Sequence, residues 1–128
     1  ALGAALVEQF GGRVAAQDPW VLDDAGLVSM YPDLVWYPGS GGPGLVVDAK
    51  YKVDAVPNAD VYQLLAYCTG LGLSEGHLVY ARGAGEARVY EVVGAGVRIV
   101  AHAVDLGLDP EGLRRQVEGL ADALIRYA

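Results

Sequence analysis

The chain has 128 residues, of which 53% are hydrophobic, and its nine lysines and arginines against sixteen aspartates and glutamates give a net charge of −7. This length and composition predict one folded domain with a substantial core and exclude a disordered segment. Free-standing DNA binders are usually basic, so the acidic balance argues against one unless bound cations or a partner chain offset it.

The ends of the chain and its cysteine content give further bounds. The sequence starts at Ala1 and its only methionine is Met30, so we expect a single domain, residues 1–128, excised from a longer protein. The apolar start has no basic leader before Glu8, and no uncharged stretch reaches the roughly 18 apolar residues of a membrane span. We therefore expect a cytoplasmic protein with no membrane partner. The single cysteine, Cys68, excludes an internal disulfide and is expected in the core.

Three helices are predicted from apolar residues at helical spacing, at residues 1–10, 58–69 and 110–127. The first carries Leu2, Leu6 and Phe10 on one face and ends at Gly11-Gly12, which suit a left-handed cap; the last has Asp109 as its N-cap. Between the helices, strand-like runs are predicted at residues 13–17, 20–22, 27–37, 45–52, 77–81, 87–93 and 97–104. This order predicts an α/β (α+β) fold with a mixed central sheet flanked by helices.

A possible site of chemistry lies in the apolar strand of residues 45–52. Side chains alternate between the faces of a strand, so Asp48 and Lys50 point the same way. The Pro- and Gly-rich connection at residues 38–44 predicts a hairpin that places the strand beginning near Asp33 beside this one. Two carboxylates on adjacent strands can hold a hard divalent cation, and a neighbouring lysine can orient or deprotonate the attacking water. The pattern therefore indicates a metal-dependent nuclease.

Four stretches resemble the PD-(D/E)xK nuclease superfamily and, within it, the nuclease domain of McrC-type restriction subunits. They are residues 6–10, 32–35, 46–52 and 62–67, which read LVEQF, PDLV, VVDAKYK and YQLLAY. The resemblance implies a restriction-endonuclease-like core and endonucleolytic hydrolysis of DNA in a modification-dependent, 5-methylcytosine-specific defence system.

The resemblance also implies roles for particular residues. Asp33 and Asp48 would ligate Mg²⁺, for which Mn²⁺ is a natural substitute, with the backbone carbonyl of Ala49 as a further ligand. Lys50 would serve the attacking water. Glu8, on the first helix, matches an acid that completes the metal site in many members of the superfamily.

The predicted second helix carries a Gln-x-x-x-Tyr motif, Gln63 and Tyr67. In related nucleases this motif faces the active site, so Gln63 is expected to order the site, with Tyr67 in support. Lys52 lies on the same strand face as Lys50 and could contact a phosphate, although a solvated surface charge is an equally good interpretation.

Partners follow from the same resemblance. The resemblance to McrC-type subunits implies a GTP-dependent AAA+ motor as partner. Because no Gly-x-x-x-x-Gly-Lys-Ser/Thr phosphate loop occurs in this sequence, an McrB-like motor would lie on another chain. DNA is the expected substrate. One departure from the family is that Met30-Tyr31 precede Pro32, where an arginine is frequent.

Other interpretations stay open at this stage. A structural salt bridge between Asp48 and Lys50 would need no metal. The acidic balance and the missing arginine fit a non-catalytic module that assembles with a motor. An enzyme of the same fold that acts on RNA, or on branched or single-stranded DNA, fits the same residues. His77 and His102 lack metal-ligand spacing, so surface or packing roles are expected for them.

Overall fold

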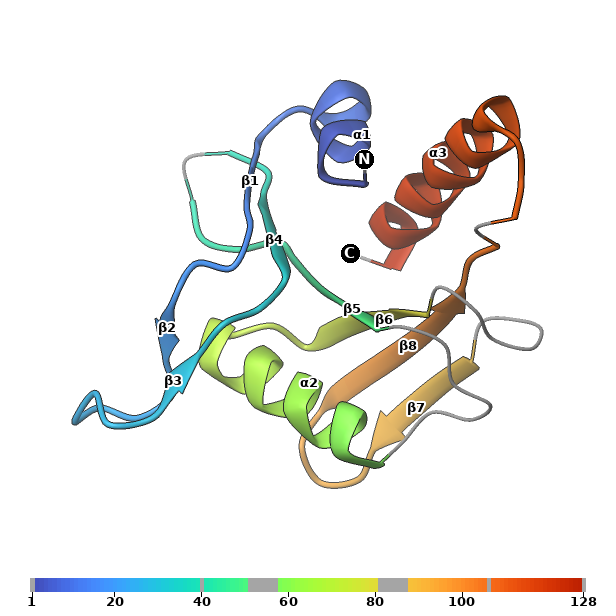
Figure 1. Ribbon diagram of the computed structural model, residues 1–128. Coiled ribbons are helices and arrows are strands. Elements are labelled where there is room, and N and C mark those ends of the chain that lie inside the picture. The colour runs from blue at the N-terminus through green and yellow to red at the C-terminus, as the bar shows by residue number, and fades with distance from the viewer. Residues whose placement is uncertain (1, 40, 51–57, 81–87, 106, 128) are drawn as a thin grey trace.

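The computed structural model describes residues 2–39, 41–50, 58–80, 88–105 and 107–127 (Figure 1). The elements in chain order are α1 (Leu2–Phe10), β1 (Arg13–Ala15), β2 (Trp20–Val21), β3 (Ser29–Met30), β4 (Leu34–Tyr37), β5 (Leu45–Lys50), α2 (Asn58–Leu71), β6 (Glu75–Tyr80), β7 (Arg88–Val92), β8 (Val97–Ala103) and α3 (Pro110–Tyr127). Within these residues, no helix is long and apolar enough to cross a membrane.

The main sheet has six strands in the order β1-β4-β5-β6-β8-β7, and β2 and β3 form a separate two-stranded sheet. The strand β6 is parallel to both β5 and β8, whereas the other pairs in the main sheet are antiparallel. This mixed sheet confirms the predicted α/β class, and the antiparallel pairing of β4 with β5 confirms the predicted neighbours.

Helices cover both faces of the main sheet: α2 lies on one face, and α1 and α3 lie together on the other (Figure 1). The side chains of β5 alternate accordingly. Val46 packs with Leu64 and Cys68 of α2, whereas Leu45 and Val47 belong to the cluster that includes Leu6 of α1 and Leu124 of α3; this second cluster confirms that the last helix packs on the sheet. The resulting three layers are compatible with a nuclease-like core.

Two predicted helix caps are confirmed, at the end of α1 and at the start of α3. Gly11 and Gly12 have φ angles of 74° and 76°, the left-handed conformation that glycine adopts without strain. At the start of α3, the N–H of Gly112 donates to Asp109 Oδ1 at 2.7 Å, so Asp109 is the N-cap. Of the three residues predicted on one face of α1, Leu6 is buried, whereas Phe10 is 37% exposed.

Several predicted boundaries differ from the structure, among them the start of β6, which is Glu75 rather than residue 77. The first strand ends at Ala15 rather than residue 17. The single run predicted at residues 27–37 is divided between β3 and β4, which belong to different sheets, because Pro32 interrupts the run and has no N–H for a ladder. Helix α2 continues through Gly70, where an added Cβ would lie 2.2 Å from Met30 Cε, so glycine allows β3 to approach the helix closely.

Candidate functional site

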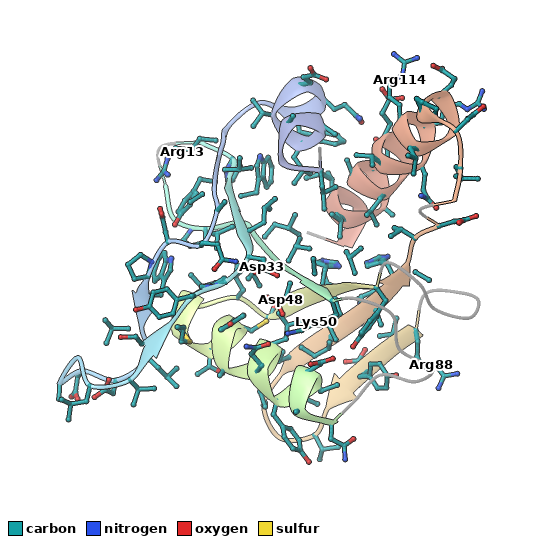
Figure 2. All side chains as sticks on the ribbon, in the orientation of Figure 1. Arg13, Asp33, Asp48, Lys50, Arg88 and Arg114 are labelled. Atoms are coloured by element: carbon teal, nitrogen blue, oxygen red, sulfur yellow. The ribbon has the colours of Figure 1, made fainter. Side chains whose placement is uncertain are left out.

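Asp33 directly precedes β4, and Asp48 lies near the C-terminal end of the neighbouring strand β5. The register pairs Leu34 with Val47, so one step further along the antiparallel strands Asp33 is opposite Asp48. Opposite residues in such a pair project from the same face. Figure 2 shows Asp33, Asp48 and Lys50 grouped beside α2. The structure therefore brings together the three residues on which the sequence argument rested.

The carboxylate of Asp33 is held by two donors. The backbone N–H of Ala49 donates to Oδ2 at 2.9 Å, and the side-chain amide of Gln17 donates to Oδ1. These contacts tie the carboxylate to β5 and to the segment after β1. Carboxylates that ligate metal ions are themselves commonly oriented by hydrogen bonds of this kind.

The backbone of Ala49 faces the same place. In an antiparallel pair, the N–H and C=O of one residue point to the same edge of the strand, so donation by the Ala49 N–H to Asp33 directs its carbonyl toward Asp33 as well. If the pairing of Leu34 with Val47 is continued by two residues, Pro32 comes opposite Ala49, and proline has no N–H to donate to this carbonyl. The Ala49 oxygen is thus oriented toward the site without a ladder donor from the residue opposite.

Asp48 is only 3% exposed, and its Oδ2 lies 2.7 Å from Lys50 Nζ. Burial raises the pKa of Asp48, and the nearby charge of Asp33 adds to this shift, while the contact with Lys50 opposes it. Oδ2 is buried and receives no hydrogen bond of good geometry from a described residue. A second cation beside this carboxylate would stabilise its charged form.

Lys50 joins β5 to α2. Its Nζ donates to Gln63 Oε1 at 2.7 Å and lies 3.7 Å from Asp60 Oδ1. Burial alone would lower the Lys50 pKa, but the contact with Asp48 and the charges of Asp48, Asp60 and Asp33 outweigh it, so the pKa is raised. Lys50 therefore carries a positive charge at neutral pH, which suits orienting a water or stabilising an anion better than removing a proton.

Two tyrosines, Tyr67 and Tyr80, contact residues that adjoin the site. The hydroxyl of Tyr67 lies 3.5 Å from the backbone oxygen of Tyr31, which is two residues before Asp33. Tyr80 donates to Asp60 Oδ2 at 3.0 Å and so fixes the acid that contacts Lys50. Of the motif on α2, Gln63 thus contacts the lysine directly, and Tyr67 contacts the backbone leading to Asp33.

The structure does not group the predicted ligand Glu8 with Asp33 and Asp48. Glu8 is exposed on α1, and among the described residues no three His, Cys, Asp or Glu side chains are grouped closely enough to hold one metal ion. The other predicted residue, Lys52, lies outside the described residues. The described oxygen donors are therefore the carboxylates of Asp33 and Asp48 and the carbonyl of Ala49. Oxygen donors are the type that Mg²⁺ prefers, and these three leave room for water.

Sequence reasoning missed three residues of the site, Gln17, Asp60 and Tyr80. Asp60 is three residues before Gln63 on the same helix, a spacing that makes the two side chains neighbours and could have identified it. No comparable signal exists for Gln17, because its contact with Asp33 depends on the conformation of the segment after β1.

The two histidines lie elsewhere. Both are buried, and His77 Nδ1 lies 3.1 Å from His102 Nε2. Their registers with Val47 and Val79 place them on the sheet face covered by α1 and α3, opposite to the site. The packing role is confirmed and the surface alternative is wrong.

The fold and the site define a mixed α/β domain with two neighbouring aspartates and a lysine at the ends of adjacent central strands. Comparison with known families gives a more particular result: residues 6–81 match the family described as McrBC 5-methylcytosine restriction system component. This match covers more than half of the chain, so the protein belongs to that family. No curated protein matches it.

Proposed function

We propose that the chain is a metal-dependent endodeoxyribonuclease, the PD-(D/E)xK cleavage module of an McrBC-type restriction system. One observation carries this proposal: Asp33, directly before β4, accepts from the N–H of Ala49, the residue after Asp48 on the neighbouring strand β5, and Lys50 Nζ lies 2.7 Å from Asp48 Oδ2. The membership of the restriction-system family agrees with it.

The residues present fit a magnesium ion. Asp33, Asp48 and the carbonyl of Ala49 would hold it, and Mn²⁺ should substitute for it. When bound, the ion lowers the pKa of a ligated water and offsets negative charge on the phosphate. Lys50, held by Gln63 at 2.7 Å, orients the attacking water and stabilises the developing negative charge. Asp60 keeps the lysine in place through the contact at 3.7 Å.

The charge distribution supports a division of labour with another subunit. The net charge is −7, and several arginines away from the site are already engaged. Arg13 stacks over the Tyr37 ring at 3.9 Å, Arg98 pairs with Glu91 at 2.7 Å, and Arg114 pairs with Glu111 at 2.7 Å. We propose that a GTP-dependent AAA+ motor on another chain supplies most of the positive surface that grips DNA.

Cleavage should therefore be tested in the assembled system. Wild-type protein and the Asp48→Asn variant are each combined with the motor subunit, GTP, Mg²⁺ and 5-methylcytosine-containing plasmid. The wild type should cut the plasmid, and Asp48→Asn should not, although it still assembles with the motor. No cleavage by an assembled wild-type complex would contradict the proposal, and faster cleavage of RNA, branched DNA or single strands would change the substrate.

A non-catalytic module that assembles with the motor is a second candidate. The observation that favours it is the same ion pair, because Asp48 and Lys50 can neutralise each other without a metal. On this alternative, both aspartates can be replaced without effect on DNA cleavage by the assembled system, whereas the proposed nuclease loses cleavage.

A further inference from the structure

Gln17 has an unusual backbone. Its φ angle is 60°, and it is the only non-glycine residue with a positive φ among those the structure describes. This left-handed region is unfavourable for a residue with a Cβ atom. Strained residues persist where the surrounding structure holds them, and they concentrate at functional sites.

The contacts of Gln17 all lead to the Pro32-Asp33 dipeptide. Its backbone N–H is shared between the carbonyl oxygens of Pro32, at 3.1 Å, and Asp33, at 3.3 Å. Its side-chain amide donates to Asp33 Oδ1. The left-handed conformation therefore directs a backbone donor and a side-chain donor of one residue to the same two residues.

Packing does not explain why a glutamine occupies this position. The residue is exposed, so its side chain adds little to the core. Glycine would adopt the same φ without strain and would keep the backbone contacts. What glycine would lose is the amide on Asp33, which is the feature that distinguishes glutamine here.

We propose that Gln17 is a positioning residue for Asp33, an inference that rests on the proposed metal-dependent function. Its amide holds Oδ1 while the N–H of Ala49 holds Oδ2 at 2.9 Å. Because Gln17 and Ala49 each donate to one carboxylate oxygen, the Asp33 side chain is held in a single orientation. In this orientation a free lone pair is directed toward the side where Asp48 lies. Gln17 thereby raises the affinity of the site for a divalent cation without contacting the cation.

Two substitutions separate this role from a structural one. Gln17→Gly removes the amide and the strain together, and Gln17→Ala removes the amide but keeps the strain. Mn²⁺ is titrated calorimetrically into each variant and into the wild type, and thermal unfolding without metal is measured in parallel. Gln9→Ala, at an exposed position on α1, is the matched control.

Both Gln17 variants should bind Mn²⁺ about 10- to 100-fold more weakly than the wild type, the usual effect of removing a group that orients a ligand. Gln17→Gly should nevertheless unfold at or above the wild-type temperature, and Gln17→Ala below Gln17→Gly. Wild-type affinity in a folded Gln17→Gly variant would overturn the positioning role alone. A folded wild type that binds no Mn²⁺ would overturn the proposed metal-dependent function as well, so the two failures are distinguishable.

Discussion

The two faces of the main sheet bury polar side chains in opposite ways. On the face covered by α2, Asp48 and Lys50 form an ion pair at 2.7 Å that extends to Gln63 and Asp60. On the face covered by α1 and α3, His77 and His102 lie within an apolar cluster with their ring nitrogens 3.1 Å apart.

The difference appears in the direction of the pKa shifts. Burial and the contact with His102 lower the pKa of His77 to about 3, and burial lowers that of His102, so this face holds its imidazoles uncharged at neutral pH. On the other face, the acids around Lys50 raise its pKa and keep it charged. The charge kept on Lys50, at the end of β5 and next to an exposed Ala49, is available for binding and chemistry.

Replacing Lys50 should have the largest effect on the α2 face. Lys50→Met should reduce cleavage by the assembled system by about 10²- to 10⁴-fold, the usual contribution of one positioned group. Mn²⁺ affinity should stay equal or rise, because an ammonium 2.7 Å from Asp48 Oδ2 no longer competes with the metal. Cleavage rates and Mn²⁺ calorimetry measure the two effects, and unchanged cleavage would remove Lys50 from the mechanism.

On the sheet face covered by α1 and α3, His77 should make the free energy of unfolding fall at low pH. Because the folded pKa of His77 lies below its unfolded value near 6.5, its contribution is complete above pH 6.5 and is lost as the pH falls toward about 3. The associated loss of unfolding free energy is on the order of a few kcal/mol. Urea unfolding at several pH values should give a flatter dependence for His77→Leu than for the wild type. Equal slopes would show that His77 does not titrate on unfolding.

A smaller effect is expected at Asp60. Asp60→Asn removes a charge 3.7 Å from Lys50 Nζ but keeps a polar group for Tyr80. Cleavage should fall about tenfold and the lysine-dependent limb of its pH profile should move to lower pH, because one of the charges that raise the Lys50 pKa is gone. Asp122→Asn, at an exposed position on α3, should change neither quantity. An unshifted pH profile would contradict the role of Asp60.

The smallest effect is expected at Glu8. This residue is exposed on α1, and α1 buries Ala5 and Leu6 in the cluster on the opposite face of the sheet. Glu8→Gln should therefore bind Mn²⁺ within about twofold of the wild type, in the range of an ordinary surface substitution. A loss of tenfold or more would instead make Glu8 a ligand, as the family resemblance implied.

Several parts of the site could be predicted because they depend on local periodicity. The alternation of β5 gives Asp48 and Lys50 one face, and the turn-forming residues after β4 make the Asp33 strand its neighbour. These relations need only strand and turn geometry. The contact of Gln63 with Lys50 was expected instead from the Gln-x-x-x-Tyr motif of the family that the sequence resembles.

Other parts depend on contacts between distant segments. Gln17 reaches Asp33 because a residue after β1 adopts a left-handed conformation that its sequence does not signal. The histidine pair depends on the parallel pairing of β6 with β8, which places residues 25 positions apart beside each other. The division of residues 27–37 between two sheets likewise reflects tertiary pairing rather than local propensity.

The most direct test of the proposed site is a calorimetric titration of Mn²⁺ into the wild-type protein and into Asp48→Asn, with circular dichroism to establish that both are folded. Asp48 provides a buried carboxylate that faces Asp33, so the wild type should bind the ion saturably and Asp48→Asn should not. A well-folded wild type that binds no Mn²⁺ would contradict the metal site and favour the non-catalytic module.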